Sequence, residues 1–302
     1  MLTNNSSSLK LLLIKMEYDD RYHQAQRPKY DYLLFDLDDT LYPLSSGLAT
    51  ACRKNIEDYM MEKLGIEANK IPDMCNVLYK TYGTTMAGLR AIGYDFDHDE
   101  YHSFVHGRLP YDKLKPDPVL RHLLLSLPFR RVIFTNADKI HAAKALSRLG
   151  LEDCFEGIIC FETLNPHKIS PPSDDEASTQ TQREGVFDIL EHISKPNAES
   201  ELPKTPIICK SSESAFEKAL KIANINPQRT IFFDDSIRNI QSGKQVGLHT
   251  VLVGTSHKVK GADYALESIH NIREALPELW EGEGKTDVKY SGKVAIETFV
   301  HA

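Results

Sequence analysis

Short apolar runs and longer amphipathic stretches alternate along most of this chain. The apolar runs, which are typical of buried strands, are YLLF (32–35), RVIFT (131–135), GIICF (157–161), PIIC (206–209), TIFFDD (230–235) and HTVLVG (249–254). Stretches with helical periodicity follow several of them, at 138–151, 212–224 and 236–247. This alternation predicts an α/β fold with a doubly wound, Rossmann-like parallel sheet that helices cover on both faces.

A second helical pattern interrupts the alternation after the first strand. Residues 45–112 contain helical stretches such as LATACRKNIEDYMMEKLG, which Gly65 is well suited to end. The alternation resumes near Asp117, which can cap the next helix. We therefore predict a helical domain at 45–112, inserted into a core made of 31–44 and 113–280.

Three segments have a composition that does not suit a packed core. Residues 165–205 are rich in Ser, Pro, Asp and Gln, with one helix-like piece (GVFDILEHI), and are predicted to form a surface insertion. Residues 1–30, which are rich in Ser and Asn at their start, are predicted to be disordered. Residues 281–302 carry no strong pattern and are predicted to form a C-terminal tail.

The composition argues against several classes of protein. A net charge of -7 and a pI near 6.0 disfavour nucleic acid binding, because phosphate backbones are held mainly by clustered Lys and Arg. The five cysteines include no C-x-x-C pair, so no disulfide framework is expected, and the twelve histidines are interpreted as solvated or core residues. The apolar run at 11–14 is too short to span a membrane. We expect a cytoplasmic protein without a nucleic acid or membrane partner, and no protein partner can be named.

Four of the predicted strands end in polar residues. These residues are Asp36 and Asp38, then Thr135 and Asn136, then Lys210, and finally Asp234 and Asp235. The carboxyl ends of parallel strands lie at one edge of an open sheet, where the connecting loops converge. These side chains are therefore expected to share one site. Taken singly, the acids could be helix caps, Thr-Asn a turn, and the lysine a solvated surface residue.

The expected site has the charge pattern of metal-assisted phosphate chemistry. Two acidic clusters brought together repel each other unless a cation lies between them, so Asp36, Asp234 and Asp235 suggest an oxygen-ligand site for Mg²⁺. A divalent ion bound at this site could in turn bind the oxygens of a phosphate group. Lys210 and the hydroxyl of Thr135 could then hold phosphoryl oxygens.

Together, the four motifs resemble those of the haloacid dehalogenase superfamily. They are DLDDT (36–40), FTNAD with Thr135, the lysine after IIC, and FFDDS (232–236), in the family's order and spanning about 31–265. The segment CKSSE lacks the Pro that often follows this lysine in related phosphatases, which leaves Lys204 as an alternative. The strand-like PIIC directly before Lys210 favours Lys210.

The resemblance implies an aspartyl-phosphate mechanism. Asp36 would attack the phosphorus, and Asp38 would protonate the leaving oxygen and then activate the hydrolytic water. Asp38 also favours a phosphatase over a dehalogenase, because release of a halide needs no proton donor. The implied ligands of Mg²⁺ are Asp36, the Asp38 backbone carbonyl and Asp234 or Asp235, and the implied phosphoryl ligands are Thr135, Asn136 and Lys210.

The helical insertion resembles the family's cap domain, which closes over the site. Residues 79–95 and 232–244 resemble the pyrimidine 5′-nucleotidase-like branch of fungi and plants, which implies a nucleoside monophosphate such as UMP or CMP as the substrate. Tyr82, Thr84 and Arg90 are candidate contacts for the nucleoside. The alternatives are a phosphatase of a sugar phosphate or another small metabolite, and a catalytically silent binding protein.

Overall fold

The computed structural model describes residues 29–166, 185–195 and 201–280. One compact unit spans Pro28–Leu276, and the short helix η5 (Pro277–Leu279) is the described element beyond it. The predicted tail and nearly all of the predicted disordered N-terminal segment lie outside the described residues. None of the described helices combines the length and the apolar character that a membrane span needs.

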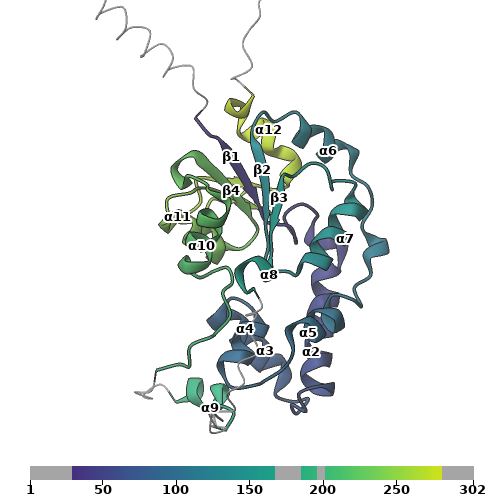
Figure 1. Cartoon of the computed structure of the whole chain (residues 1–302), viewed down its shortest axis with the longest axis vertical. Helices are drawn as coiled ribbons and strands as arrows, with labels where there is room; N and C mark the ends of the chain where they lie inside the picture. The colour runs from purple at the N-terminus through teal and green to yellow at the C-terminus, as the bar shows by residue number, and fades with distance from the viewer. Residues whose placement is uncertain (1–28, 167–184, 196–200, 281–302) are drawn as a thin grey trace, which may run out of the picture. The chain divides into compact units, whose positions relative to one another are not determined.

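Six parallel strands form one sheet, in the order β3-β2-β1-β4-β5-β6 (Figure 1). Their bounds are β1 Tyr32–Phe35, β2 Arg130–Phe134, β3 Gly157–Ile159, β4 Thr230–Asp234, β5 His249–Val253 and β6 Tyr264–Leu266. Phe35 of β1 lies opposite Ile133 of β2 on one side and Phe233 of β4 on the other. The strand order reverses between β1 and β4, which is where open α/β sheets bind ligands. The predicted parallel α/β fold is confirmed.

Helices cover both faces of the sheet, with α10 and α11 on one side and α6 and α7 on the other (Figure 1). The helices of this part are α6 Pro118–Leu125, α7 Lys139–Leu149, α8 Phe161–Leu164, α10 Glu213–Ala223, α11 Ile237–Gln245 and α12 Ile272–Ala275, with the 3-10 turns η1 Leu44–Ser46, η2 Tyr111–Lys113, η3 Pro227–Arg229 and η4 Ile269–Asn271. Asp117 caps α6 as predicted, because its carboxylate accepts the Leu120 N–H at 2.8 Å.

Three buried phenylalanines anchor the central strands to α10. The rings of Phe134 in β2 and Phe232 in β4 both meet Phe216 of α10 edge to face, at centroid distances of 5.2 and 5.3 Å. Ile240 of α11 belongs to the same apolar cluster. This packing fixes the strands whose carboxyl ends carry the polar residues.

Ile207 and Cys209 of the PIIC segment (206–209) are buried, but the segment is not a strand, so this prediction was wrong. The backbone of Ile208 pairs with the side-chain amide of Asn165, which accepts from the Ile208 N–H at 2.8 Å and donates to its carbonyl at 2.9 Å. The Asn165 amide thus satisfies the backbone groups that a neighbouring strand would otherwise bond. The short edge strand β6 was not predicted, because three residues carry too little periodicity.

Four helices inserted after β1 pack around a core of their own, and we call them the helical region. They are α2 Leu48–Glu62, α3 Ile71–Tyr82, α4 Thr85–Ala91 and α5 His98–Val105. Tyr59, Leu78, Leu89 and Val105 lie at the centre of this core, each at most 1% exposed. The helices lie where the helical pattern was found, while the domain boundaries at 45 and 112 stay a prediction.

Residues 185–195 of the 165–205 segment pack against the helical region. Ile189, the first residue of α9 (Ile189–Ser194), is completely buried in the core of that region. The Phe187 N–H donates to the carbonyl of Ile92 at 2.9 Å, just after α4. This part of the segment therefore extends the helical region, while 167–184 and 196–200 lie outside the described residues.

Candidate active site

The polar residues at the strand ends meet at one edge of the sheet. Asp36 follows β1, Thr135 follows β2 and Asp234 ends β4, which are three adjacent strands. A cavity of about 400 Å³ opens at this edge, and its wall includes Asp36, Asp38, Thr135, Asn136, Lys210 and Asp235. Asp234 lies behind the wall and is 0% exposed.

Lys210 links the two acidic clusters. Its Nζ donates to Asp36 Oδ1 at 2.6 Å, to Asp234 Oδ2 at 2.8 Å and to the Phe134 carbonyl at 2.7 Å, which uses all three ammonium hydrogens. The side chain is 1% exposed. Burial lowers the pKa of Lys210, but the charges of Asp234 and Asp36 outweigh it and raise the pKa above its ordinary value. The lysine is therefore held in its charged form.

Asp234 and Asp235 have different surroundings. Asp234 Oδ1 accepts from the Ser236 N–H at 2.8 Å and from Asn239 Nδ2 at 3.0 Å, in addition to the Lys210 bond on Oδ2. Asp235 is exposed and lines the cavity. The first carboxylate is thus held from several sides, while the second faces the open space.

The carboxylate set fits a hard divalent cation. One oxygen each of Asp36, Asp234 and Asp235 lie within 4.8 Å of one another. Burial raises the pKa of Asp36 well above its ordinary value, and Lys210 offsets only part of this effect. Although Asp235 faces the cavity, partial loss of water at the cavity wall and the charge of Asp234 raise its pKa to about 7. A cation with a preference for carboxylate oxygen, such as Mg²⁺, would restore the ionised forms.

Asp38 is held by a tyrosine and a histidine. Its Oδ1 accepts from the hydroxyl of Tyr42 and lies 2.7 Å from Nε2 of His141. Nδ1 of His141 in turn lies 2.8 Å from the hydroxyl of Tyr111. Loss of water raises the pKa of Asp38, but the charge and hydrogen bond of His141 outweigh it and hold the pKa well below its ordinary value. Burial lowers the pKa of His141. The charge and hydrogen bond of the Asp38 carboxylate raise it by more, so the pKa lies above its ordinary value.

Thr135 and Asn136 differ in how free their side chains are. The Thr135 hydroxyl accepts the Ala137 N–H at 3.0 Å and keeps its own hydrogen for another group. The Asn136 amide accepts the Lys210 N–H at 2.7 Å and donates to the Lys210 carbonyl at 2.8 Å. Asn136 thus positions the lysine, and its predicted contact with phosphate stays a prediction.

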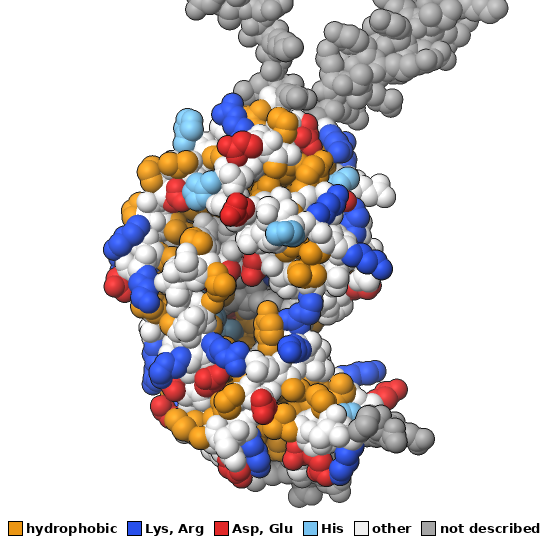
Figure 2. Space-filling model, turned by 180° about the vertical axis from the view of Figure 1, so that it is seen from behind, with side chains coloured by type: hydrophobic (Ala, Val, Ile, Leu, Met, Phe, Trp, Pro, Cys, Tyr) orange, Lys and Arg blue, Asp and Glu red, His pale blue; other side chains and the backbone are white. Residues whose placement is uncertain are grey.

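The helical region supplies the opposite wall of the cavity. Figure 2 shows the surface hollowed where the sheet-bearing part meets the helices. Cys52, Asn76, Tyr79, Thr84 and Tyr101 line this wall. Of the three candidate contacts for a nucleoside, only Thr84 is among the residues that line this cavity. Tyr82 and Arg90 bond elsewhere: the Tyr82 hydroxyl donates to the Pro203 carbonyl at 3.0 Å, and Arg90 pairs with Asp95.

Several polar residues of the cavity were missed by the sequence analysis. Tyr42 and His141 hold Asp38, and His102 and His106 line the same cavity. A signal for two of them exists, because His98, His102 and His106 recur at every fourth position and so share one face of a helix. No comparable local signal marks Tyr42 or His141.

Comparison with known proteins adds a family and several relatives. The model of haloacid dehalogenase-like hydrolases matches residues 30–247. Phosphate metabolism protein 8 of Saccharomyces cerevisiae is 25% identical over 265 residues, which cover 85% of this chain and 70% of the yeast protein.

Solved structures with a similar chain include two bacterial proteins. CbbY from Rhodobacter sphaeroides, in complex with phosphate, has a TM-score of 0.49 and 15% identity, and the match covers 83% of this chain and 99% of CbbY. The HAD-hydrolase YfnB from Bacillus subtilis, bound to magnesium, has a TM-score of 0.46 and 19% identity, with 82% and 98% of the two chains covered.

Proposed function

The chain belongs to the haloacid dehalogenase-like hydrolases, and from this premise we propose that it is a Mg²⁺-dependent phosphomonoester hydrolase that acts through Asp36 on nucleoside 5′-monophosphates. One observation carries the proposal: Lys210 Nζ bonds both Asp36 and Asp234, at 2.6 and 2.8 Å, at the edge of a shared cavity. The lysine orients two acids beside open space, at the point where three carboxylates could hold a divalent cation, and this arrangement supports the binding of an anionic, phosphorylated substrate.

Asp36 is the nucleophile of the proposed reaction. A carboxylate oxygen of Asp36 forms a bond to phosphorus while the ester P–O bond breaks, which gives an aspartyl phosphate and an alcohol. Lys210 binds one oxygen of Asp36 at 2.6 Å, so the attacking group has a fixed orientation. Thr135, whose hydroxyl hydrogen is not used by its bond to Ala137, donates to a phosphoryl oxygen.

Asp38 moves the protons of the proposed reaction. The leaving oxygen takes a proton through Asp38, which draws it from the protonated imidazole of His141, 2.7 Å away and with a raised pKa. In the second step the same pair accepts a proton from the water that attacks the aspartyl phosphate. Tyr42 and His141 fix the direction of the Asp38 carboxylate. Phosphate and free Asp36 are the products of the second step.

The carboxylate ligands of the metal are proposed from the convergence of the three acids, and the Asp38 carbonyl from the family resemblance. Asp36 and Asp235 face the cavity and would hold Mg²⁺ together with the backbone carbonyl of Asp38, while Asp234 would complete the set from behind the wall. When bound, the ion would supply positive charge beside the phosphoryl oxygens.

Support for a nucleotide comes from the cavity and from the resemblance of residues 79–95 and 232–244. About 400 Å³ is within the range of small-molecule sites, which is roughly 300–1,000 Å³. The far wall includes the side chains of Tyr79, Thr84 and Asn76, whose aromatic, hydroxyl and amide groups suit a base with polar edges. A nucleoside would reach this wall with its phosphate near Asp36.

The experiment is phosphate release from a panel of UMP, CMP, purine nucleoside monophosphates and sugar phosphates, with and without Mg²⁺. We expect Mg²⁺-dependent turnover with the highest kcat/KM on a pyrimidine nucleotide, and turnover lost in Asp36→Asn. Activity confined to sugar phosphates would move the assignment to the alternative substrate class. Equal inactivity of the wild type and Asp36→Asn on the whole panel would favour the silent binding protein instead.

A further inference from the structure

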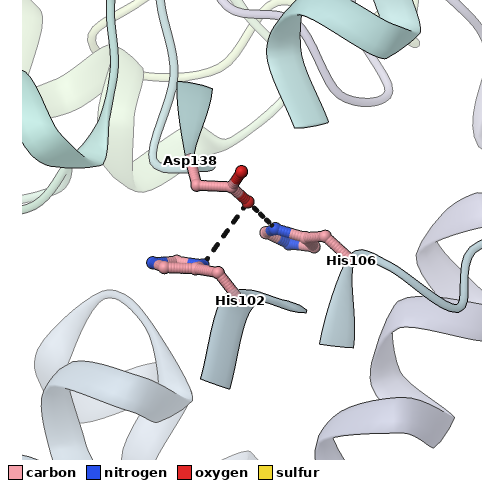
Figure 3. A group of neighbouring side chains, drawn as sticks. All are labelled: His102, His106 and Asp138. Atoms are coloured by element: carbon pink, nitrogen blue, oxygen red, sulfur yellow. Dashed lines mark hydrogen bonds and ion pairs between the residues drawn. The ribbon is translucent and has the colours of Figure 1, made fainter. Parts of the chain in front are cut away.

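A group of two histidines and one aspartate lies in the cavity region apart from the three acids. His102 belongs to α5, His106 follows the last turn of that helix, and Asp138 precedes α7 of the sheet-bearing part (Figure 3). His102 and His106 both line the cavity. The reaction proposed above uses none of the three side chains.

The ligand atoms of this group converge on one point. Nδ1 of His106 contacts Asp138 Oδ2, and Nδ1 of His102 lies 3.5 Å from the same oxygen (Figure 3). One ligand atom of each residue lies within 4.8 Å of the other two. The two imidazole rings are stacked, with centroids 5.4 Å apart and 25° between their planes. The four-residue spacing of the histidines on one helix face produces this arrangement.

His102 is the residue that packing alone does not explain. Its side chain is 9% exposed, and neither of its ring nitrogens has a hydrogen-bond partner. An imidazole has at least one N–H and one lone pair to satisfy, and leaving them buried and unpaired costs free energy. The contact between His106 and Asp138 satisfies polar groups of those two residues, but the ring nitrogens of His102 stay without a hydrogen bond. A ligand between the three groups would remove the cost.

We propose that His102, His106 and Asp138 form a second metal site, which binds a first-row divalent transition metal such as Zn²⁺. Two imidazole nitrogens and one carboxylate oxygen are a preferred ligand set of these metals, whereas Mg²⁺ selects oxygen. Burial favours the neutral imidazole of His102, which leaves the lone pair of one ring nitrogen free for a metal. A fourth coordination position would open towards the cavity that both histidines line.

The proposed site joins two parts of the protein. The histidines come from the helical region, and Asp138 caps α7 by accepting the His141 N–H at 2.9 Å. A metal bound to all three residues therefore ties the helical region to the sheet-bearing part beside the active site. We expect Zn²⁺ to raise the melting temperature of the full-length protein.

The test measures Zn²⁺ binding by calorimetry to the Mg²⁺-saturated full-length protein, with Co²⁺ as a spectroscopic probe of imidazole ligation. His102→Phe preserves the aromatic contact with Phe161, whose ring centroid is 4.7 Å away, but removes the ligand. Asp138→Asn keeps an oxygen that can cap α7 and removes the charge. His122→Phe makes the matched change at an exposed histidine, and Asp235→Asn separates this site from the carboxylate site.

We expect His102→Phe and Asp138→Asn each to lose at least about tenfold in Zn²⁺ affinity, together with the intense Co²⁺ absorption and the rise in melting temperature. His122→Phe and Asp235→Asn should retain all three. The proposal is overturned if the wild type shows no imidazole-ligated Co²⁺, if His102→Phe and Asp138→Asn both bind Zn²⁺ as tightly as the wild type, or if only Asp235→Asn loses binding. Circular dichroism of each variant separates a lost ligand from a lost fold, and if His102→Phe does not fold, Asp138→Asn decides.

Discussion

At the sheet edge, the side chain of Lys210 provides hydrogen bonds in place of the water that the buried carboxylates of Asp36 and Asp234 lose on folding. Asp36 and Asp234 are 6% and 0% exposed, and each is bonded by the same lysine. Such a triad gains little net stability while it is intact, because desolvation offsets the attraction. Its loss is costly, since a single removed partner leaves an uncompensated buried charge.

Replacing Lys210 with Met should therefore affect both stability and turnover. We expect the metal-free variant to lose about 3–5 kcal/mol of unfolding free energy, because Asp36 and Asp234 lose their shared cation. Activity should fall by about 10²–10³-fold. Urea unfolding and phosphate release measure the two effects.

Lys204→Met is the matched control, because Lys204 is exposed and was the alternative lysine. It should leave both quantities unchanged. A large loss of activity in Lys204→Met with a small loss in Lys210→Met would contradict the assignment.

His141 is expected to act through Asp38. His141→Asn removes the group 2.7 Å from Asp38 Oδ1, so the proton-transferring carboxylate loses its fixed direction. We expect kcat to fall by about 10²-fold while KM stays within a few-fold. Steady-state kinetics check this, with His122→Asn as an exposed control. A raised KM with unchanged kcat would instead assign His141 to substrate binding.

Among the structural elements, the turn between α3 and α4 contacts the backbone of Lys210. Gly83 has a φ of +91°, and a Cβ on it would lie 2.6 Å from the Lys210 carbonyl oxygen. Arg238 of α11 fastens the same end of α3, because its Nη1 donates to the carbonyls of Tyr79 and Lys80 at 2.8 and 2.9 Å. The helical region thus touches the backbone that carries the buried lysine.

Gly83→Ala should disturb the active site, whereas Gly65→Ala should not. Gly65 also has a positive φ, +67°, but nothing lies within 4 Å of its added Cβ. We expect Gly65→Ala to cost about 1–2 kcal/mol of unfolding free energy with unchanged kcat. Gly83→Ala should cost more and lower kcat, because Lys210 must move. Equal effects of both variants on kcat would refute the coupling.

The edge strand β6 depends on a charged pair that should make stability sensitive to acid. Asp263 accepts from the Thr250 N–H at 2.9 Å and from Lys244 Nζ at 2.7 Å. Burial raises the pKa of Asp263, but the hydrogen bonds from Lys244 and Thr250 together with the charge of Lys244 outweigh it, and the net shift is downward from 3.8. The ionised form is therefore favoured in the folded state.

Asp263→Asn should lower the unfolding free energy by about 1 kcal/mol at neutral pH. A lowered folded-state pKa contributes stability above the unfolded value of 3.8, and this contribution disappears as the pH falls through the folded value. The difference between wild type and variant should thus be constant near neutral pH and shrink below about pH 4. Urea unfolding at several pH values tests this. A difference in unfolding free energy that grows as the pH falls would contradict the prediction.

For the whole molecule, metal binding and folding should be coupled. Asp36, Asp234 and Asp235 come from the ends of two strands, so their carboxylates converge only in the folded chain. Mg²⁺ at about 100 times its Kd should then stabilise the protein by about 2.7 kcal/mol. Removal of the metal should abolish turnover.

Thermal unfolding across a Mg²⁺ titration measures this coupling. The shift should be smaller in Asp235→Asn, which loses a carboxylate that faces the cavity. It should also be larger at pH 8 than at pH 6, because the pKa of Asp235 is raised to about 7 and the ion binds the ionised form. A shift that is the same in Asp235→Asn would place the ion elsewhere.

The order of apolar runs and polar ends along the chain already determined much of this protein. Strand–helix alternation predicted the parallel sheet, and acids after β1 and β4 were expected at its carboxyl edge, because burial and periodicity are local properties. Only the tertiary structure decided which groups finally pair. The PIIC run met the amide of Asn165 instead of a strand, His141 reached Asp38 across 103 positions, and His102 met Asp138. Such pairings depend on where distant elements pack, and no local pattern records that.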